Sequence, residues 1–252
     1  MKLKCRIITT FLLLVFIVYG QDTTYYDIKG KKVNLSEQAH HYKVVLRDPV
    51  STNRKIEQEY SNTGILKSEA HQIEVSRDKE DGRLITKKNG KYKEWYDNGQ
   101  LYKDIDYKNG KIDGKLITYW EDGSMKRMDN FKRGEFRDGK CFNSDGDIID
   151  HFPYEVIPEF PGGELALFRY ISKNSIYPVE MQRMGLKGKV VVRFIVDKDG
   201  IVTHVEVVKS ASPEFDAEAV RIVKSMPIWM PGIQDGEVVP VYYTLPVVFK
   251  LK

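Results

Sequence analysis

The glycine-rich loop Gly-Leu-Lys-Gly at residues 185–188 is a natural first place to look for chemistry, because paired glycines can cradle a phosphate. Phosphate-binding glycines follow a strand and open a helix, so that the N-terminus of the helix faces the anion. Here the order is reversed, since a helical run precedes Gly185 and a valine-rich strand follows Gly188. The sequence therefore predicts a connection between a helix and a strand, and no nucleotide site.

The spacing of residues gives little support for a metal site or for a catalytic nucleophile. The acidic run Asn143–Asp150 could be an EF-hand loop only if Cys141 and Phe152 stood at its first and last ligand positions, where neither can bind calcium. We predict hairpin turns there, with a weak cation site as the alternative. The histidines lack zinc spacings, and no Gly-x-Ser-x-Gly elbow occurs. Cys141 is expected to be a buried or incidental thiol in a repeat turn, and not a nucleophile. We predict no metal, no cofactor, no catalytic residue and a protein that is not an enzyme.

The first twenty residues resemble an export signal. Lys2, Lys4 and Arg6 precede an apolar run from Ile7 to Tyr19, and Gly20 offers a small residue for cleavage. This run is shorter than the roughly 20 apolar residues of a membrane span, although an uncleaved anchor is the alternative. Without those three bases the formal net charge of +4 falls to +1. Such a balance argues against a nucleic-acid partner, which requires a strongly basic face.

The middle of the chain repeats itself. A segment that begins GKYKEWYDNGQLYK at Gly90 recurs 24 residues later as GKLITYWEDGSMKR at Gly114, with aromatic and glycine positions aligned. A shorter copy begins at Gly139, and a degraded one lies at Tyr60–Glu69. Asn-Gly and Asp-Gly steps supply the left-handed backbone of tight hairpins. Because one hairpin cannot bury its own face, we predict an all-β meander in which neighbouring hairpins stack.

A stretch rich in proline and glycine, residues 153–163, ends the repeats. After it, Leu165, Phe168 and Ile171 recur at helical spacing and predict a helix that buries them. Asn174 is expected to end this helix in the left-handed conformation.

The remaining residues predict a short helix, a hairpin, a longer helix and a final strand. Residues 189–196 and 201–208 alternate as two strands, and Ser212 is a good N-cap for a helix that Pro227 stops. Residues 241–251 form a long strand with one apolar face. Together these elements make a small α+β domain, whereas residues 21–58 can be assigned no further than a leading strand pair or an ordered arm.

Two family resemblances follow from these motifs. The pattern G-x-Y-x-x-W-Y-x-N-G resembles MORN-type repeats over about residues 59–152, and such repeats serve as binding or spacing surfaces. The ordered series FPGG, SKN, YP, GKVVVRFIVDKDG, FDAEAV, W-M-P and PVVFKL is similar to the C-terminal domain of TonB-family energy transducers, over about residues 155–252. The second resemblance implies two helices packed on a three-stranded antiparallel sheet. The expected fold class is therefore α+β, with this domain preceded by an all-β repeat meander.

The TonB resemblance also implies a partner. Family members grip the periplasmic plug segment, or TonB box, of outer-membrane TonB-dependent transporters and pass on work from a proton-driven inner-membrane motor. In this chain the grip should involve the Tyr-Pro segment and the edge of the final strand. The implied partner-binding residues are Asn174, Ser175, Ile176, Tyr177, Pro178, Val241, Tyr242, Tyr243, Thr244, Leu245, Val247, Val248 and Phe249.

The final strand carries two prolines, Pro240 and Pro246, whose missing N–H groups point to the same side of the strand. That side should be the outer edge, since a central position would leave two ladder bonds unmade. Addition of a partner strand there would lose two donors at roughly 1 kcal/mol each. We therefore expect weak binding, or binding that relies on the Tyr177-Pro178 side.

The chain departs from the family in having a signal-like start, and repeats in place of a long proline-rich linker. We expect a signal segment (1–20), an arm (21–58), repeats (59–152) and a TonB-type domain (155–252). The expected function is that of an exported, periplasm-facing binding protein in energy-coupled outer-membrane transport, in contact with motor proteins and anchored in the inner membrane only if the N-terminal segment is retained. The alternative is an envelope scaffold whose repeats bind a partner without motor coupling, and a homodimer is left open.

Overall fold

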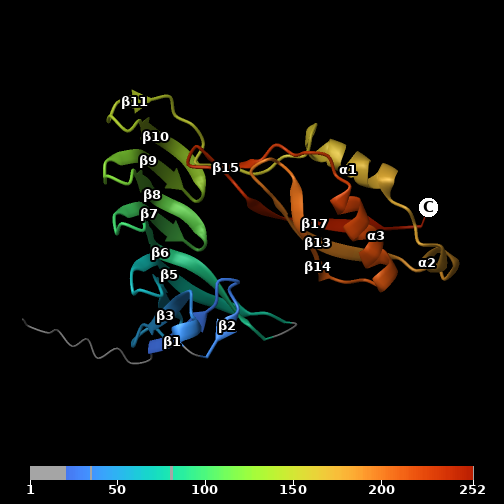
Figure 1. Cartoon of the computed structure of the whole chain (residues 1–252), viewed down its shortest axis with the longest axis horizontal. Coiled ribbons are helices and arrows are strands. Elements are labelled where there is room, and N and C mark those ends of the chain that lie inside the picture. The colour runs from blue at the N-terminus through green and yellow to red at the C-terminus, as the bar shows by residue number, and fades with distance from the viewer. Residues whose placement is uncertain (1–20, 35, 80–81, 252) are drawn as a thin grey trace, which may run out of the picture. The chain divides into compact units, whose positions relative to one another are not determined.

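The structure is a computed structural model that describes residues 21–34, 36–79 and 82–251. The predicted export signal lies outside these residues. The chain divides into two compact units, with the division between His151 and Phe152 (Figure 1). We call them the repeat unit and the terminal domain and describe each by itself.

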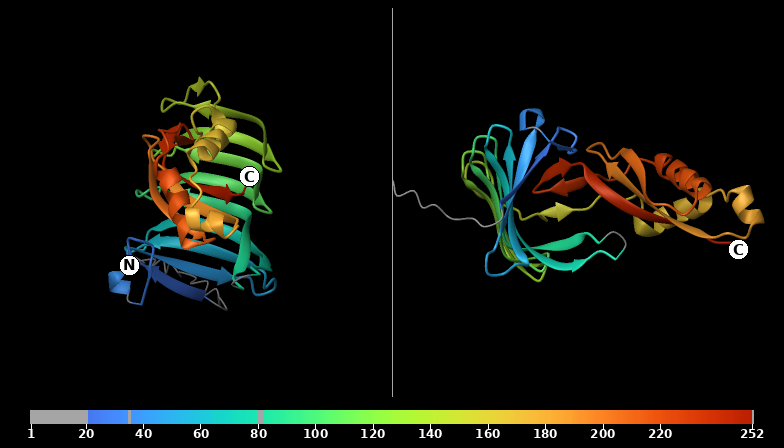
Figure 2. Two further views of the ribbon diagram at one scale, coloured as in Figure 1. Left: turned by 90° about the vertical axis from the view of Figure 1, so that its right-hand side faces the viewer. Right: turned by 90° about the horizontal axis from the view of Figure 1, so that it is seen from below.

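The repeat unit is an antiparallel sheet of eleven strands among the described residues, and Figure 2 shows that this sheet is curved. Strands β3 to β11 form a meander in which each strand pairs with the next, while β1 pairs with β3 and with β2. The strands are β1 (Gln21–Tyr26), β2 (Lys32–Val33), β3 (His41–Arg47), β4 (Arg54–Ser61), β5 (Leu66–Arg77), β6 (Leu84–Trp95), β7 (Leu101–Lys108), β8 (Lys111–Tyr119), β9 (Met125–Lys132), β10 (Glu135–Phe142) and β11 (Ile148–Ile149), with a 3-10 turn at Ser36–Gln38.

Equivalent turns lie at one edge of the sheet, four of them in the predicted repeats and a fifth between β1 and β2, and the four confirm the predicted hairpins. In each turn the N–H of a glycine donates to the carbonyl three residues before it, as from Gly99 to Tyr96 and from Gly123 to Trp120. The predicted turn in the acidic run is one of the four, because Gly146 bonds to Asn143 in the same way. At the opposite edge, two-residue turns such as Asn109-Gly110 have positive φ at both positions (52° and 82°), as type I′ hairpins require.

Side chains join one repeat to the next. The Tyr96 hydroxyl donates to the Tyr119 carbonyl at 2.8 Å, and the Asn98 amide donates to the Glu121 carbonyl at 3.0 Å. Both bonds run from the turn after β6 to the end of β8 or the turn after it. Neighbouring hairpins thus support each other, as the repeat pattern predicts.

The interior of the repeat unit mixes apolar and charged side chains. Ile105 and Leu116 are buried beside Arg127 and Asp129, both 0% exposed, whose side chains form a 2.7 Å ion pair. His151 Nε2 lies 2.9 Å from the other carboxylate oxygen of Asp129. This polar cluster has no counterpart in the sequence-based expectations.

Cys141 lies in strand β10 and not in a turn, contrary to the prediction, and its thiol is free and buried. The turn begins two residues later, at Asn143, because that side chain accepts the N–H groups of Asp145 and Asp147.

The terminal domain is α+β, as predicted. Its main sheet has the order β14-β13-β17, and a smaller sheet has the order β12-β15-β16. The helices are α1 (Gly163–Asn174), α2 (Val179–Arg183) and α3 (Pro213–Lys224), and the strands are β12 (Glu155–Val156), β13 (Gly188–Val196), β14 (Val202–Lys209), β15 (Gly232–Gln234), β16 (Glu237–Val239) and β17 (Val241–Phe249).

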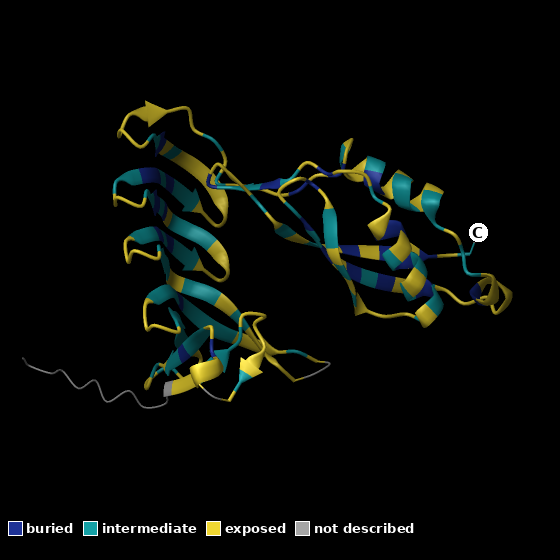
Figure 3. Cartoon of the chain, in the orientation of Figure 1, coloured by how far each residue is buried: buried dark blue, intermediate teal, exposed yellow. Residues whose placement is uncertain are grey.

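One apolar core holds this domain together (Figure 3). Alternate residues of β13, from Val190 to Val196, are 0% exposed and pack with the apolar stripe of α3. The Ser212 side chain accepts the Phe215 N–H at 3.3 Å and so caps α3 as expected. Residues 245, 247 and 249 of β17 complete the core from the other side of β13.

The predicted apolar face of α1 is wrong for two of its three residues. Leu165 and Phe168 are 69% and 49% exposed, whereas Leu167 is 2% exposed and Tyr170 and Ile171 pack against the core. The helix carries two overlapping apolar stripes at helical spacing. The contact of the Tyr170 hydroxyl with Ser225, beyond the end of α3, accompanies burial of the second stripe.

The predicted left-handed end of α1 at Asn174 is also wrong. Asn174 does not have a positive φ, and the chain leaves the helix through Ser175 in an extended conformation. The Asn174 amide donates to the Tyr170 carbonyl at 2.8 Å, and the Ser175 N–H bonds to Ile171. These bonds satisfy carbonyls of the last turn without a left-handed residue.

Candidate partner-binding site

Strand β17 lies at an edge of the main sheet, with β13 as its neighbour. Pro246 stands opposite Val191 in this pair and has no N–H to donate. Because hydrogen-bonded and non-hydrogen-bonded pairs alternate along antiparallel strands, Pro246 occupies a non-hydrogen-bonded position. Tyr242, Thr244 and Val248 share its parity, so their backbone N–H and C=O groups point to the open edge of β17.

The side chains of β17 divide between two faces. Those of Leu245, Val247 and Phe249 are at most 3% exposed and belong to the core, so a partner cannot reach them. Tyr242 and Val248 are 67% and 49% exposed on the opposite face. Of the predicted site residues on β17, the odd-numbered ones therefore support the strand, and the even-numbered ones present the free edge.

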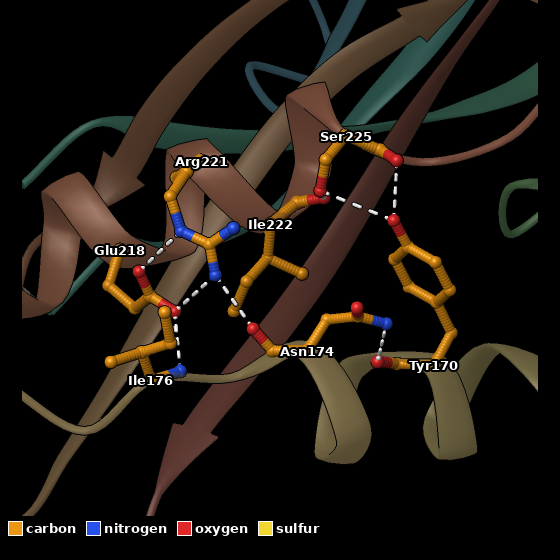
Figure 4. Close-up of polar contacts among 7 residues, drawn as sticks. All are labelled: Tyr170, Asn174, Ile176, Glu218, Arg221, Ile222 and Ser225. Atoms are coloured by element: carbon orange, nitrogen blue, oxygen red, sulfur yellow. Dashed lines mark hydrogen bonds and ion pairs between the residues drawn. The ribbon is translucent and has the colours of Figure 1, made fainter.

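The other half of the predicted site, residues 174–178, is bound to α3 (Figure 4). The Ile176 N–H donates to Glu218 at 2.6 Å, and Arg221 donates to the Asn174 carbonyl at 2.7 Å. Glu218 and Arg221 also bond to each other through two contacts of 2.8 Å. Two main-chain groups of this extended segment are thus already in use, although the Ile176 side chain is 65% exposed.

Tyr177 brings the two halves of the site together. Its ring meets Phe249 of β17 edge-on, with ring centres 6.2 Å apart, and Phe215 of α3 at 5.5 Å. Its hydroxyl donates to the Leu186 carbonyl. Pro178 follows in extended geometry, with φ of −61° and ψ of 129°. Tyr177 therefore holds residues 174–178 against strand β17, helix α3 and the residues that precede β13.

Sequence reasoning missed Glu218 and Arg221. Their spacing on α3 is that of an ordinary surface ion pair, and only the fold shows that they hold residues 174 and 176. Burial would raise the pKa of Glu218, but hydrogen bonds from Arg221 and from the Ile176 N–H, together with the charge of Arg221, lower it below its ordinary value. The ionised form is therefore the one that suits this contact.

The described part of the chain contains no group of three or more His, Cys, Asp or Glu side chains that could hold a metal ion. Within the same residues, no helix has the length and apolar character needed to cross a bilayer.

Comparison with known proteins assigns two segments. Residues 173–251 match the family model of the Gram-negative bacterial TonB protein C-terminal domain, and residues 88–109 match that of a MORN repeat variant. No curated protein matches the chain.

Two solution structures of the Helicobacter pylori TonB C-terminal domain are similar to part of it. One is 29% identical over 35% of this chain and 79% of that chain, with a TM-score of 0.29. The other is 27% identical over 35% of this chain and 92% of that chain, also with a TM-score of 0.29.

The family match supports a protein-interaction role of the TonB kind for the terminal domain. Domains of this family are non-enzymatic, are associated with the cell envelope, and generally interact with outer-membrane TonB-dependent transporters.

Proposed function

We propose that this chain is an exported, periplasm-facing protein whose terminal domain binds a peptide segment of outer-membrane transporters and takes part in energy-coupled transport. The observation that carries the proposal is the open edge of β17 within a domain that matches the TonB family. An edge strand offers a row of backbone donors and acceptors that an extended peptide can complete.

The register of β17 defines how such a peptide would bind. Outward donors come from Tyr242, Thr244 and Val248, and Pro246 supplies only a carbonyl. The partner would therefore make fewer main-chain bonds than on an uninterrupted edge, at a loss of roughly 1 kcal/mol per missing donor. We expect weak binding and rapid dissociation. Rapid dissociation suits a partner that must separate after each transport event.

Residues 174–178 do not offer a second strand edge to the peptide. Its backbone is held by Glu218 and Arg221, so we assign it a positioning role that fixes Tyr177 against Phe249. The exposed side chain of Ile176 is the part of this segment that is available for direct contact.

The test uses the full chain and a synthetic peptide from the plug segment of a co-occurring outer-membrane transporter. The wild-type chain should bind the peptide at millimolar concentration or below, as measured by chemical-shift changes. Thr244→Pro removes one outward donor without breaking the pairing to β13, and should weaken binding about five-fold, as the loss of one hydrogen bond of roughly 1 kcal/mol implies. Thr244→Val, which keeps the backbone N–H at the same position, is the matched control and should leave binding unchanged.

The same experiment separates the envelope-scaffold alternative, in which the repeats bind the partner. If Thr244→Pro binds the peptide as well as wild type does while its melting temperature is unchanged, the β17 edge is not the binding site. Capture of a transporter that depends on the repeat turns instead would favour the scaffold.

A further inference from the structure

Residues 176–189, which include α2 and the first two residues of β13, present several large apolar side chains to solvent. We call this segment the tip. Its exposed fractions are 65% for Ile176, 63% for Val179, 58% for Met184 and 45% for Leu186. Single exposed apolar residues are ordinary, but a group of large ones along one short segment marks an interaction surface.

The tip is held in place by two other side chains. Met181 of α2 is 5% exposed and accepts a hydrogen bond from the Ser212 hydroxyl at 3.6 Å through its sulfur. Tyr177 packs against Phe215, and its hydroxyl donates to the Leu186 carbonyl. These anchors enter the core from either side of Val179, so the exposed apolar residues are offered from a fixed scaffold.

The charged residues of the tip are mostly basic. Arg183, Lys187 and Lys189 are exposed, and Glu180 is the one acidic residue in the segment. Lys250 is also exposed and directly follows Phe249, which pairs with Gly188 at the start of β13.

The acidic residue of α3 nearest the tip is Glu218, which accepts the Ile176 N–H and is paired with Arg221. Two further acidic residues lie in the first turn of α3. Glu214 is half-buried there, and Asp216 is occupied by the Ser210 hydroxyl and the Ala211 N–H. Exposed basic side chains thus outnumber the acidic ones along the tip.

We propose that the tip docks on the surface of a membrane that contains anionic lipids. Apolar side chains can enter the boundary between headgroups and acyl chains, while basic side chains next to them pair with anionic headgroups. A soluble polyanion would use the bases but would leave the four apolar side chains exposed. The tip shares Ile176 with the proposed peptide-binding site, whereas Val179, Met184 and Leu186 lie outside that site.

The test follows amide hydrogen exchange of the full chain in a peptide that covers the tip. We expect vesicles of phosphatidylcholine with phosphatidylglycerol to slow exchange there at least three-fold, and vesicles of phosphatidylcholine alone to have no effect. A local readout is needed because the apolar residues 7–19 could bring every variant to the vesicles.

Double substitutions test which residues cause the protection from exchange. Met184→Ser with Leu186→Ser should abolish the protection, and Lys187→Gln with Lys189→Gln should reduce it. Ile228→Ser with Met230→Ser changes two apolar residues of similar exposure, 65% and 63%, outside the tip and should retain it.

Three results would overturn the proposal. They are no slowing with anionic vesicles, equal slowing with neutral vesicles, and equal slowing by a soluble glutamate-rich peptide without lipid. The last result would identify a docking surface for acidic proteins instead.

Discussion

The repeat unit and the terminal domain are stabilised in different ways. In the terminal domain the fully buried positions of β13 and α3 are all apolar, and two layers close around them. In the repeat unit a curved single sheet buries Thr118, Arg127 and Asp129 next to Ile105 and Leu116. A sheet without a second layer has few apolar contacts per residue, so its ladder and its internal ion pairs carry more of its stability.

Because of this difference, a local structural defect should affect a different share of each unit. Each hairpin of the repeat unit pairs only with its two neighbours, so a defect acts first on adjacent repeats. The terminal domain shares one core, so a defect anywhere in it acts on the whole domain. Destabilising substitutions should therefore act mainly through lost ion pairing in the repeat unit and through lost apolar packing in the terminal domain. The resulting losses in the free energy of unfolding should also differ in size.

The largest effect should come from the buried charges of the repeat unit. Asp129→Ala removes the carboxylate that lies 2.7 Å from the buried Arg127 and should lower the free energy of unfolding by about 3–5 kcal/mol. The control is Glu135→Ala, which removes the partner of Arg137 in a pair whose side chains are 73% and 53% exposed, and it should cost less than about 1 kcal/mol. Hydrogen exchange in peptides from β8 and β9, followed across a series of urea concentrations, measures both. Similar losses in the two variants would contradict a polar core in this unit.

In the terminal domain the corresponding change is apolar. Ile222→Ala opens a cavity at a 0% exposed position and should cost about 2–4 kcal/mol. Ile228→Ala, at a position that is 65% exposed, should stay within about 0.5 kcal/mol of wild type. Hydrogen exchange measured on peptides from each unit would show whether the loss is confined to the terminal domain. If the repeat strands lost protection equally, the two units would not be separate in stability.

Sequence periodicity could predict the terminal domain well, because β13 and α3 each have a single apolar face. It failed at α1, where Leu165 and Phe168 compete with Leu167 and Tyr170 for the buried side, and only tertiary contacts decide between such stripes. In the repeats, hairpin turns could be predicted from Asn-Gly and Asp-Gly steps.

The buried pair Arg127 and Asp129 could not be predicted, since nothing local distinguishes these residues from exposed ones. At the candidate site, the prolines of the last strand indicate an outer edge, and the sheet order places β17 at an edge. The Glu218 and Arg221 contacts to residues 174–176 depend on the packing of two helices and leave no sequence signal.

Substitution of Gly139 in the repeat unit should have a smaller effect on stability, and it tests how closely atoms are packed around Arg127 and Asp129. A Cβ at Gly139 would overlap the Asp129 carboxylate, whereas a Cβ at Gly99 would meet no atom within 4 Å. Gly139→Ala should therefore cost about 2–3 kcal/mol through overpacking. Gly99→Ala should cost about 1 kcal/mol, through its φ of 85° alone. Equal unfolding midpoints in urea would show that Asp129 can move aside freely, against a closely packed polar core.

The smallest effect should come from the polar contact at the rim of the terminal domain, and it should depend on pH. The pKa of Glu218 is lowered in the folded protein, so its ionised form adds stability above the ordinary value of 4.5, and this stability is lost as the pH falls through the lowered pKa. Glu218→Gln should cost about 1–2 kcal/mol at pH 7 and less at pH 3.

Glu206→Gln is the matched control for this substitution, because Glu206 pairs with Arg193 with both side chains about half exposed. It should change stability by less than about 0.5 kcal/mol at either pH. Urea unfolding of the three proteins at pH 7 and pH 3 measures the difference. A loss for Glu218→Gln that is the same at both pH values would mean that the carboxylate charge does not hold residues 174–176. In that case the charge of Glu218 would add nothing to the stability of the terminal domain, and the contrast with the buried ion pair of the repeat unit would be sharper.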